Sequence, residues 1–130
     1  MGNKGLFVLI DDDTDDHEIF KMALDDVDKN LECLFFPDCE SALAHFDSGP
    51  VMAPGFVFVD ISLPRINGAQ CLQQLQRLQE FDSPVIIIYS TTIPEEWKPQ
   101  LETIGVDKFI EKTGPISALT TQLQHLLQAG

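Results

Sequence analysis

Short apolar runs alternate with stretches of helical periodicity along the whole chain. Five apolar runs have the length and the Val, Ile and Phe content of strands, and they cover residues 6–10, 31–36, 56–59, 85–89 and 106–110. The segments that follow them carry apolar residues at spacings of three and four, which predicts helices over residues 14–28, 38–48, 67–80, 94–104 and 115–128. Strands that are apolar throughout and alternate with helices are typical of a parallel sheet covered on both faces. The pattern therefore predicts a single-domain α/β fold.

Polar residues and prolines indicate where these elements begin and end. Asp13 or Thr14 is expected to cap helix 14–28, and its first turn carries acids that favour the positive end of a helix: Asp15, Asp16 and Glu18. Asp38 is the expected cap of helix 38–48. A loop is predicted before strand 56–59, at Pro50, Pro54 and Gly55. Pro99 lies inside helix 94–104, so this helix either begins late, near Pro99, or is kinked.

Composition narrows the class of protein. The 130 residues carry a net charge of −13, from 8 Lys and Arg against 21 Asp and Glu, which argues against direct binding of nucleic acid. The three cysteines include no C-x-x-C pair, so reduced thiols in the cytosol are expected. No apolar run approaches the ~20 residues of a membrane helix, and the N-terminal run is too short for a signal peptide. A cytoplasmic domain without a membrane segment is expected.

Residues capable of chemistry follow four of the five predicted strands. In parallel sheets, the working site lies outside the carboxyl ends of the strands. These positions hold carboxylates after the first and third strands, hydroxyls after the fourth and an ammonium after the fifth: Asp11, Asp12, Asp13, Asp60, Ser90, Thr91, Thr92 and Lys112. Clustered carboxylates repel one another, and a hard divalent cation relieves that repulsion. Such a cation could also hold a phosphoryl group, with the hydroxyl and the ammonium on its other oxygens.

Four segments together resemble one known family. They are VLIDDD, FVFVDISLPRINGAQCL, PVIIIYST and GVDKFIEK, and they resemble the receiver domain of two-component response regulators over nearly the whole chain. The resemblance implies a flavodoxin-like (βα)5 fold of three layers, with a parallel sheet in the order 2-1-3-4-5. It places the aspartate that is phosphorylated at Asp60, and the Pro and Gly that follow it at Pro64 and Gly68.

The resemblance also implies the other roles at the site. Asp12, Asp60 and the backbone carbonyl of Ser62 would bind Mg²⁺ directly, and Asp11 would act mainly through a metal-bound water. Ser90 and Lys112 would hold the acyl phosphate. Ser90 and Phe109 would form the conformational switch. Three positions would govern phosphoryl lifetime and access: Ser62, Thr91 and Thr92.

By the same resemblance, the chain is expected to be a receiver over residues 1–130 with no output domain, similar to stand-alone chemotaxis response regulators. A sensor histidine kinase or phosphotransfer protein would supply the phosphoryl group. A downstream protein would bind at the face of the fourth helix, fifth strand and fifth helix. The protein is expected to catalyse only its own phosphorylation and dephosphorylation.

Some positions depart from the family pattern or have an ordinary explanation. Thr113 follows Lys112 where the family usually has proline, often after a cis peptide bond. Phe109 lacks the hydroxyl that would hold it outward, so we expect its ring to lie mostly inward at rest. The histidines are expected to be ordinary residues of helix surfaces: His17, His45 and His125.

Other function classes fit less well. A small aspartate-nucleophile phosphatase of the haloacid dehalogenase type would use Asp11 and Asp13 in a D-x-D motif, but Asp15 stands where that motif has Thr or Val. A flavodoxin-like FMN carrier needs a phosphate loop that is not acidic. A calcium loop from Asp11 fails because Asp16 replaces its glycine and Met22 its glutamate. A degenerate receiver that only binds partners would usually have lost an acid or the lysine.

Overall fold

Five parallel strands form one sheet. The computed structural model describes residues 3–48, 52–61, 76–77, 80, 83–112 and 114–129. The strands are β1 (Asn3–Ile10), β2 (Glu32–Phe36), β3 (Pro54–Val59), β4 (Val85–Ser90) and β5 (Val106–Glu111), in the spatial order β2-β1-β3-β4-β5. This is the strand order expected for a flavodoxin-like receiver fold, and that prediction is confirmed.

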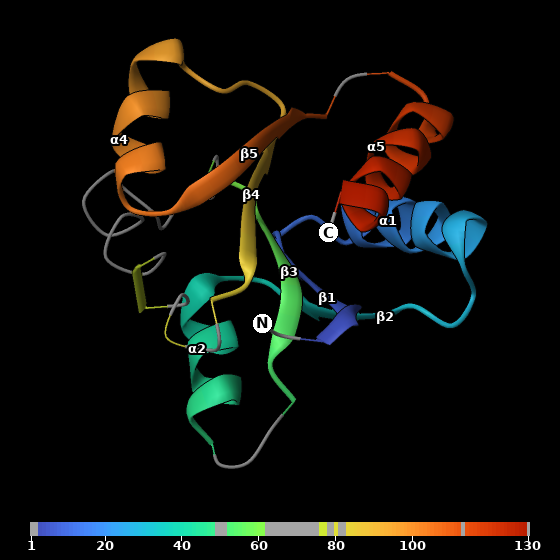
Figure 1. Cartoon of the computed structure of the whole chain (residues 1–130), viewed down its shortest axis with the longest axis horizontal. Coiled ribbons are helices and arrows are strands. Elements are labelled where there is room, and N and C mark those ends of the chain that lie inside the picture. The colour runs from blue at the N-terminus through green and yellow to red at the C-terminus, as the bar shows by residue number, and fades with distance from the viewer. Residues whose placement is uncertain are drawn as a thin grey trace.

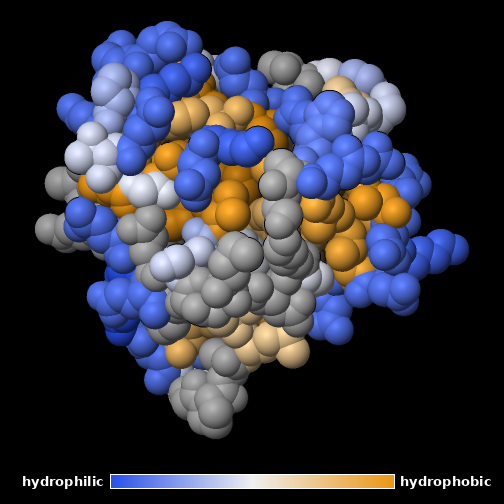
Figure 2. All heavy atoms as spheres, in the orientation of Figure 1, coloured by the Kyte–Doolittle hydropathy of each residue, from blue (hydrophilic) through white to orange (hydrophobic). Residues whose placement is uncertain are grey.

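Helices cover both faces of this sheet, giving three layers (Figure 1). On one side α1 (Thr14–Val27) packs beside α5 (Ile116–Ala129). On the other side lie α2 (Cys39–Asp47) and α4 (Lys98–Thr103), the latter preceded by the 3-10 turn η1 (Glu95–Trp97). Hydrophilic residues cover much of the surface in this view, and apolar residues show between them (Figure 2). None of the described helices has the length and apolar character needed to cross a bilayer.

Alternating side chains of the central strands fill two apolar cores. Phe7, Leu9 and Phe58 point toward α1 and α5, whereas Val8 and Val57 point toward α2 and α4. Nearly all of these side chains are inaccessible to solvent, which explains why the strands are apolar throughout rather than alternating with polar residues. Both cores therefore hold the central strands, and with them the carboxyl edge of the sheet, in fixed positions.

The predicted caps are confirmed by their hydrogen bonds. The side chain of Asp13 accepts a hydrogen bond from the backbone N–H of Asp15 at the start of α1. The side chain of Asp38 accepts one from the N–H of Ser41 at 2.7 Å, at the start of α2. Each cap satisfies a helix N–H group that has no partner within the helix.

One predicted boundary is corrected, and one of the two alternatives for Pro99 is confirmed. Pro54 and Gly55 belong to β3 rather than to a loop, because Pro54 pairs with Asn3 at the first position of the strand, where a missing N–H is tolerated. The fourth helix begins late, at Lys98, so that Pro99 lies in its first turn rather than in its interior. Of predicted helix 67–80, only residues 76, 77 and 80 are described, and the Lys112–Thr113 bond and Gly68 lie outside the described residues.

Candidate functional site

The register of the sheet brings two acids to the same edge. Ile10 of β1 is paired with Val59 of β3, so the chain leaves the sheet at Asp11 and Asp60 side by side. Three further backbone bonds, each 2.9 Å long, extend the sheet beyond the strand ends: the N–H groups of Asp11, Asp60 and Lys112 donate to the carbonyls of Phe36, Ile10 and Ser90. These bonds fix the backbone of Asp11, Asp60 and Lys112.

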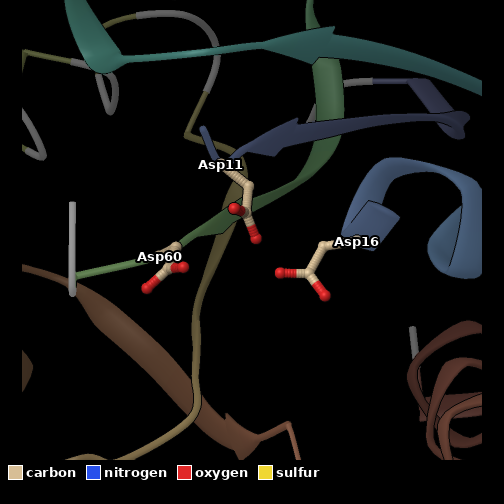
Figure 3. A group of neighbouring side chains, drawn as sticks. All are labelled: Asp11, Asp16 and Asp60. Carbon is tan, nitrogen blue, oxygen red and sulfur yellow. The ribbon is translucent and has the colours of Figure 1, made fainter. Parts of the chain in front are cut away.

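The Lys112 ammonium joins three carboxylates at this edge. Its Nζ donates to Oδ2 of Asp11 at 2.5 Å, and to Oδ2 of Asp16 and of Asp60 at 2.7 Å each. The side chains of Asp11 and Asp60 are 0% and 5% exposed, and that of Lys112 is 10% exposed. Figure 3 shows the three carboxylates turned toward a shared space, with Asp16 reaching in from α1. One oxygen from each acid lies within 4.8 Å of the others.

The predicted acids do not all meet there. Asp11 and Asp60 belong to the cluster as expected, but Asp12 is exposed and lies outside it. Asp16 takes a place in the cluster, although the sequence indicated only a role at the helix N-terminus. Its position in the sequence could have indicated this. Asp16 is only two residues into a helix that begins at Thr14, so it still lies close to the edge of the sheet. Ser62 lies outside the described residues.

The hydroxyl of Ser90 is the buried polar group that calls for explanation. Ser90 ends β4 and is fully buried, and its Oγ has no hydrogen-bond partner among the described residues. A buried hydroxyl without a partner carries a desolvation cost of about 1–3 kcal/mol. A phosphoryl oxygen would satisfy it. The neighbouring hydroxyl residues Thr91 and Thr92 are exposed, on the loop that follows.

Phe109 lies away from the acids on β5. Its ring is half-buried against the core on the α2 and α4 side, and the Lys98 ammonium lies 5.6 Å from the ring centroid. The ring is neither fully exposed nor fully buried. Its inward position at rest and its role as a switch stay predictions.

His17 is not the ordinary surface residue that the sequence suggested. Its ring stacks on Phe35, with centroids 4.9 Å apart, and its Nε2 donates to the backbone carbonyl of Asp11 at 2.6 Å. The N–H of Asp13 donates to Oδ1 of Asp11 from the same loop. These contacts fix the acidic loop between β1 and α1. Periodicity could not reveal them, because they depend on how α1 packs against β2.

The charges at the site perturb one another. Burial raises the pKa of Asp11 to about 6, against the opposing effect of its hydrogen bonds from Lys112 and Asp13. Burial alone would lower the pKa of Lys112, but its bonds to Asp11, Asp16 and Asp60 outweigh this and raise the pKa above its usual value. Ionised, the three acids and one ammonium leave two negative charges uncompensated, which suits a divalent cation.

The sequence also matches a known family. Residues 7–124 match the family profile of the response regulator receiver domain. The chain belongs to the response regulator receiver family. The strand order is that of a receiver domain, and it is the match to the family, not the fold alone, that favours a receiver over the phosphatase and FMN-carrier alternatives.

Solved structures of receivers share the fold at low sequence identity. A response regulator of red-light signalling from R. palustris is 18% identical, with a TM-score of 0.77 over 96% of this chain and 92% of that one. The phosphorylated cyanobacterial phytochrome response regulator RcpA is 19% identical, with a TM-score of 0.75 over 95% and 91%. The Mn²⁺-bound response regulator Rcp1 is 16% identical, with a TM-score of 0.72 over 93% and 90%. No protein of curated function matches the sequence.

Proposed function

We propose that this receiver domain is a phosphoacceptor switch that takes a phosphoryl group on Asp60 from a histidine kinase or a phosphotransfer protein. One observation carries the proposal: the buried Asp60 carboxylate is hydrogen-bonded to the Lys112 ammonium at the carboxyl edge of the sheet. The structural relative RcpA is described as phosphorylated, which supports the same chemistry here.

The proposed reaction transfers the phosphoryl group between two protein side chains. A carboxylate oxygen of Asp60 attacks the phosphorus of a phosphohistidine. The P–N bond breaks, its electron pair stays on the imidazole, and a P–O bond forms the acyl phosphate. Hydrolysis by water later releases inorganic phosphate and restores the carboxylate. The protein thus catalyses only its own phosphorylation and dephosphorylation.

The residues around Asp60 have complementary tasks in this proposal. Lys112 neutralises charge on the phosphoryl oxygens, because its ammonium already lies at 2.7 Å from the acceptor carboxylate. Ser90 donates its hydroxyl proton to another phosphoryl oxygen, which gives its buried Oγ the partner it lacks among the described residues. Thr91 and Thr92, at the exposed entrance, and Ser62 govern access and phosphoryl lifetime.

The donor set fits Mg²⁺, which usually binds to one or two carboxylates, several waters and a phosphate oxygen. Asp12, Asp60 and the backbone carbonyl of Ser62 would hold it directly, and Asp11 would act mainly through a metal-bound water. The bound ion would offset the negative charge of the acids and of the phosphoryl group. The structural relative Rcp1 was solved in an Mn²⁺-bound form, which supports the binding of a divalent metal here.

The proposed signal leaves through the face of α4, β5 and α5. A hollow of about 220 Å³ lies there between β5 and α5, lined by Phe109, Gln122, His125 and Leu126 among others. We propose that a downstream protein binds to this face, and not nucleic acid, since the chain carries a net charge of −13. We place the protein in the cytoplasm, where thiols are kept reduced, since its three cysteines include no C-x-x-C pair.

The proposal is tested by phosphorylation with acetyl phosphate and Mg²⁺, followed by intact-mass measurement. The wild type should gain one phosphoryl group and Asp60→Asn none. Asp26→Asn, which removes an exposed acid of α1, is the matched control and should behave like the wild type. Uptake by Asp60→Asn at the wild-type rate would overturn the assignment.

A further inference from the structure

We infer that Asp16 is a positioning residue that anchors the Lys112 ammonium from α1 and keeps it at the site when Mg²⁺ binds beside Asp11 and Asp60. The consequence for phosphoryl transfer rests on the proposed function. The anchoring itself is a property of the protein without metal or phosphate, and can be measured there.

Asp16 differs from the other two partners of Lys112 in its origin and exposure. Asp11 and Asp60 follow strands and are buried, whereas Asp16 comes from the first turn of α1 and its side chain is 21% exposed. All three bonds to the ammonium are short, at 2.5–2.7 Å. Asp16 is therefore the outer partner of a lysine whose other two partners, Asp11 and Asp60, belong to the proposed metal site.

A cavity on the Asp16 side gives the lysine room to move. Its volume is about 130 Å³, and Asp16, Tyr89 and Lys112 line it together with residues of β5 and α5, whereas Asp11 and Asp60 do not. The Lys112 ammonium lies 5.2 Å from the centroid of the Tyr89 ring, within the range of a cation–π interaction. Asp16 and Tyr89 thus offer the ammonium a place beside the metal-binding acids.

The charge of a bound metal ion explains why Lys112 needs a partner outside the metal site. A divalent ion at Asp60 and beside Asp11 would compete with the ammonium for these carboxylates and would repel it. Asp16 points into the shared space from a different element, so it can hold the lysine while the metal is bound (Figure 3). Lys112 would then stay within reach of an incoming phosphoryl group. Without Asp16, we expect the ammonium to leave when Mg²⁺ binds.

The anchoring is tested by NMR of the Lys112 ammonium protons in full-length protein, first without metal and then with saturating Mg²⁺. Without metal, Asp16→Asn should speed the exchange of these protons with water roughly tenfold, because one charge-assisted hydrogen bond is lost. Saturating Mg²⁺ should then abolish the ammonium signal of this variant. The matched control is Asp15→Asn, which removes the same charge from the same turn at an exposed position. The control and Asp16→Glu should keep the wild-type signal with and without Mg²⁺.

Equal exchange in Asp16→Asn and Asp15→Asn without metal would overturn the anchoring, whether or not the protein is phosphorylated. A second measurement asks whether Asp16 acts through the lysine. Asp16→Asn should lower the rate of phosphorylation by acetyl phosphate in the wild-type background but not in the Lys112→Gln background. An equal loss in both backgrounds would show that Asp16 contacts the metal or the phosphoryl group itself, and would contradict its role as a positioning residue.

Discussion

At the scale of single residues, the site depends on which carboxylates the fold gathers around one ammonium. Lys112 contacts acids from the end of β1, the end of β3 and the first turn of α1. Asp12 and Asp13 lie on the same loop as Asp11 and are exposed. Both side chains carry the same carboxylate, so charge cannot distinguish them. We expect only Asp12 to bind Mg²⁺, and this difference depends on which side chain can extend to the ion.

Asp12→Asn should weaken Mg²⁺ binding far more than Asp13→Asn. Asp12 is the expected direct ligand, and even indirect partners of a metal commonly contribute 10–100-fold in affinity, so a loss of roughly tenfold or more is expected. Asp13→Asn removes the same charge while asparagine keeps the helix cap, so it is the matched control. Calorimetric titration measures both affinities. Equal losses would show that the loop acts only through its overall charge.

Tyr89 should titrate abnormally late. Burial raises the pKa of its phenol to about 12, with Asp16 adding to the effect. Near pH 10 the unfolded chain loses this proton, but the folded protein keeps it. The free energy of unfolding should therefore fall as the pH rises from about 10 to about 12. Tyr89 is the only tyrosine, so its phenolate absorbance reports it directly. A midpoint near 10 in folded protein, equal to that in urea, would contradict this.

The sequence allowed the strand-end residues to be predicted, because their position depends only on where apolar runs stop. The structure accordingly brings Asp11, Asp60 and Lys112 together. Asp16 and His17 escaped prediction for a different reason. Their contacts depend on the angle at which α1 meets the sheet, and hydrophobic periodicity gives the buried face of a helix but not what its first turn touches.

At the scale of elements, the segment after β4 connects the site to the surface. β4 ends at Ser90, and η1 and a short α4 follow within a few residues. α4 was predicted only roughly, since Pro99 fits the first turn of a helix but not its interior. Trp97 ends η1 and is 39% exposed, and along the chain it lies between Ser90 and α4 of the proposed partner face.

Fluorescence of Trp97 should change when Mg²⁺ and beryllofluoride, a phosphoryl mimic, bind together. Movement of Ser90 toward the mimic would shift the segment that carries the only tryptophan. Ser90→Ala should reduce the change, whereas Thr91→Ala, at an exposed neighbouring position, should retain it. Unchanged emission in wild-type protein whose binding is verified by NMR would contradict a role for this segment.

At the scale of the whole molecule, two apolar cores hold a sheet whose edge concentrates negative charge. The cores follow from the apolar strands and were predictable, whereas the balance of charge at the edge required the three-dimensional arrangement. Three acids against one ammonium leave the native site short of positive charge. Folding therefore works against electrostatic repulsion there, and a cation that binds only to the folded protein should stabilise it.

Mg²⁺ should raise the free energy of unfolding by about 2.7 kcal/mol at a concentration 100 times its Kd, by mass action. Urea denaturation with and without the ion measures the difference. K⁺ at matched ionic strength is the control and should have a much smaller effect. An equal gain with K⁺ would mean that general screening, and not a specific site, relieves the repulsion.

The most direct test of the central claim is to locate the phosphoryl group. Wild-type protein phosphorylated in Mg²⁺ is treated with borohydride, which reduces an aspartyl phosphate to homoserine, and is then mapped by peptide mass spectrometry. The proposed chemistry predicts conversion at Asp60, because its carboxylate is buried beside Asp11 and bonded to Lys112. Conversion at Asp11, Asp12 or Asp16 instead, with Asp60 unmodified, would contradict it.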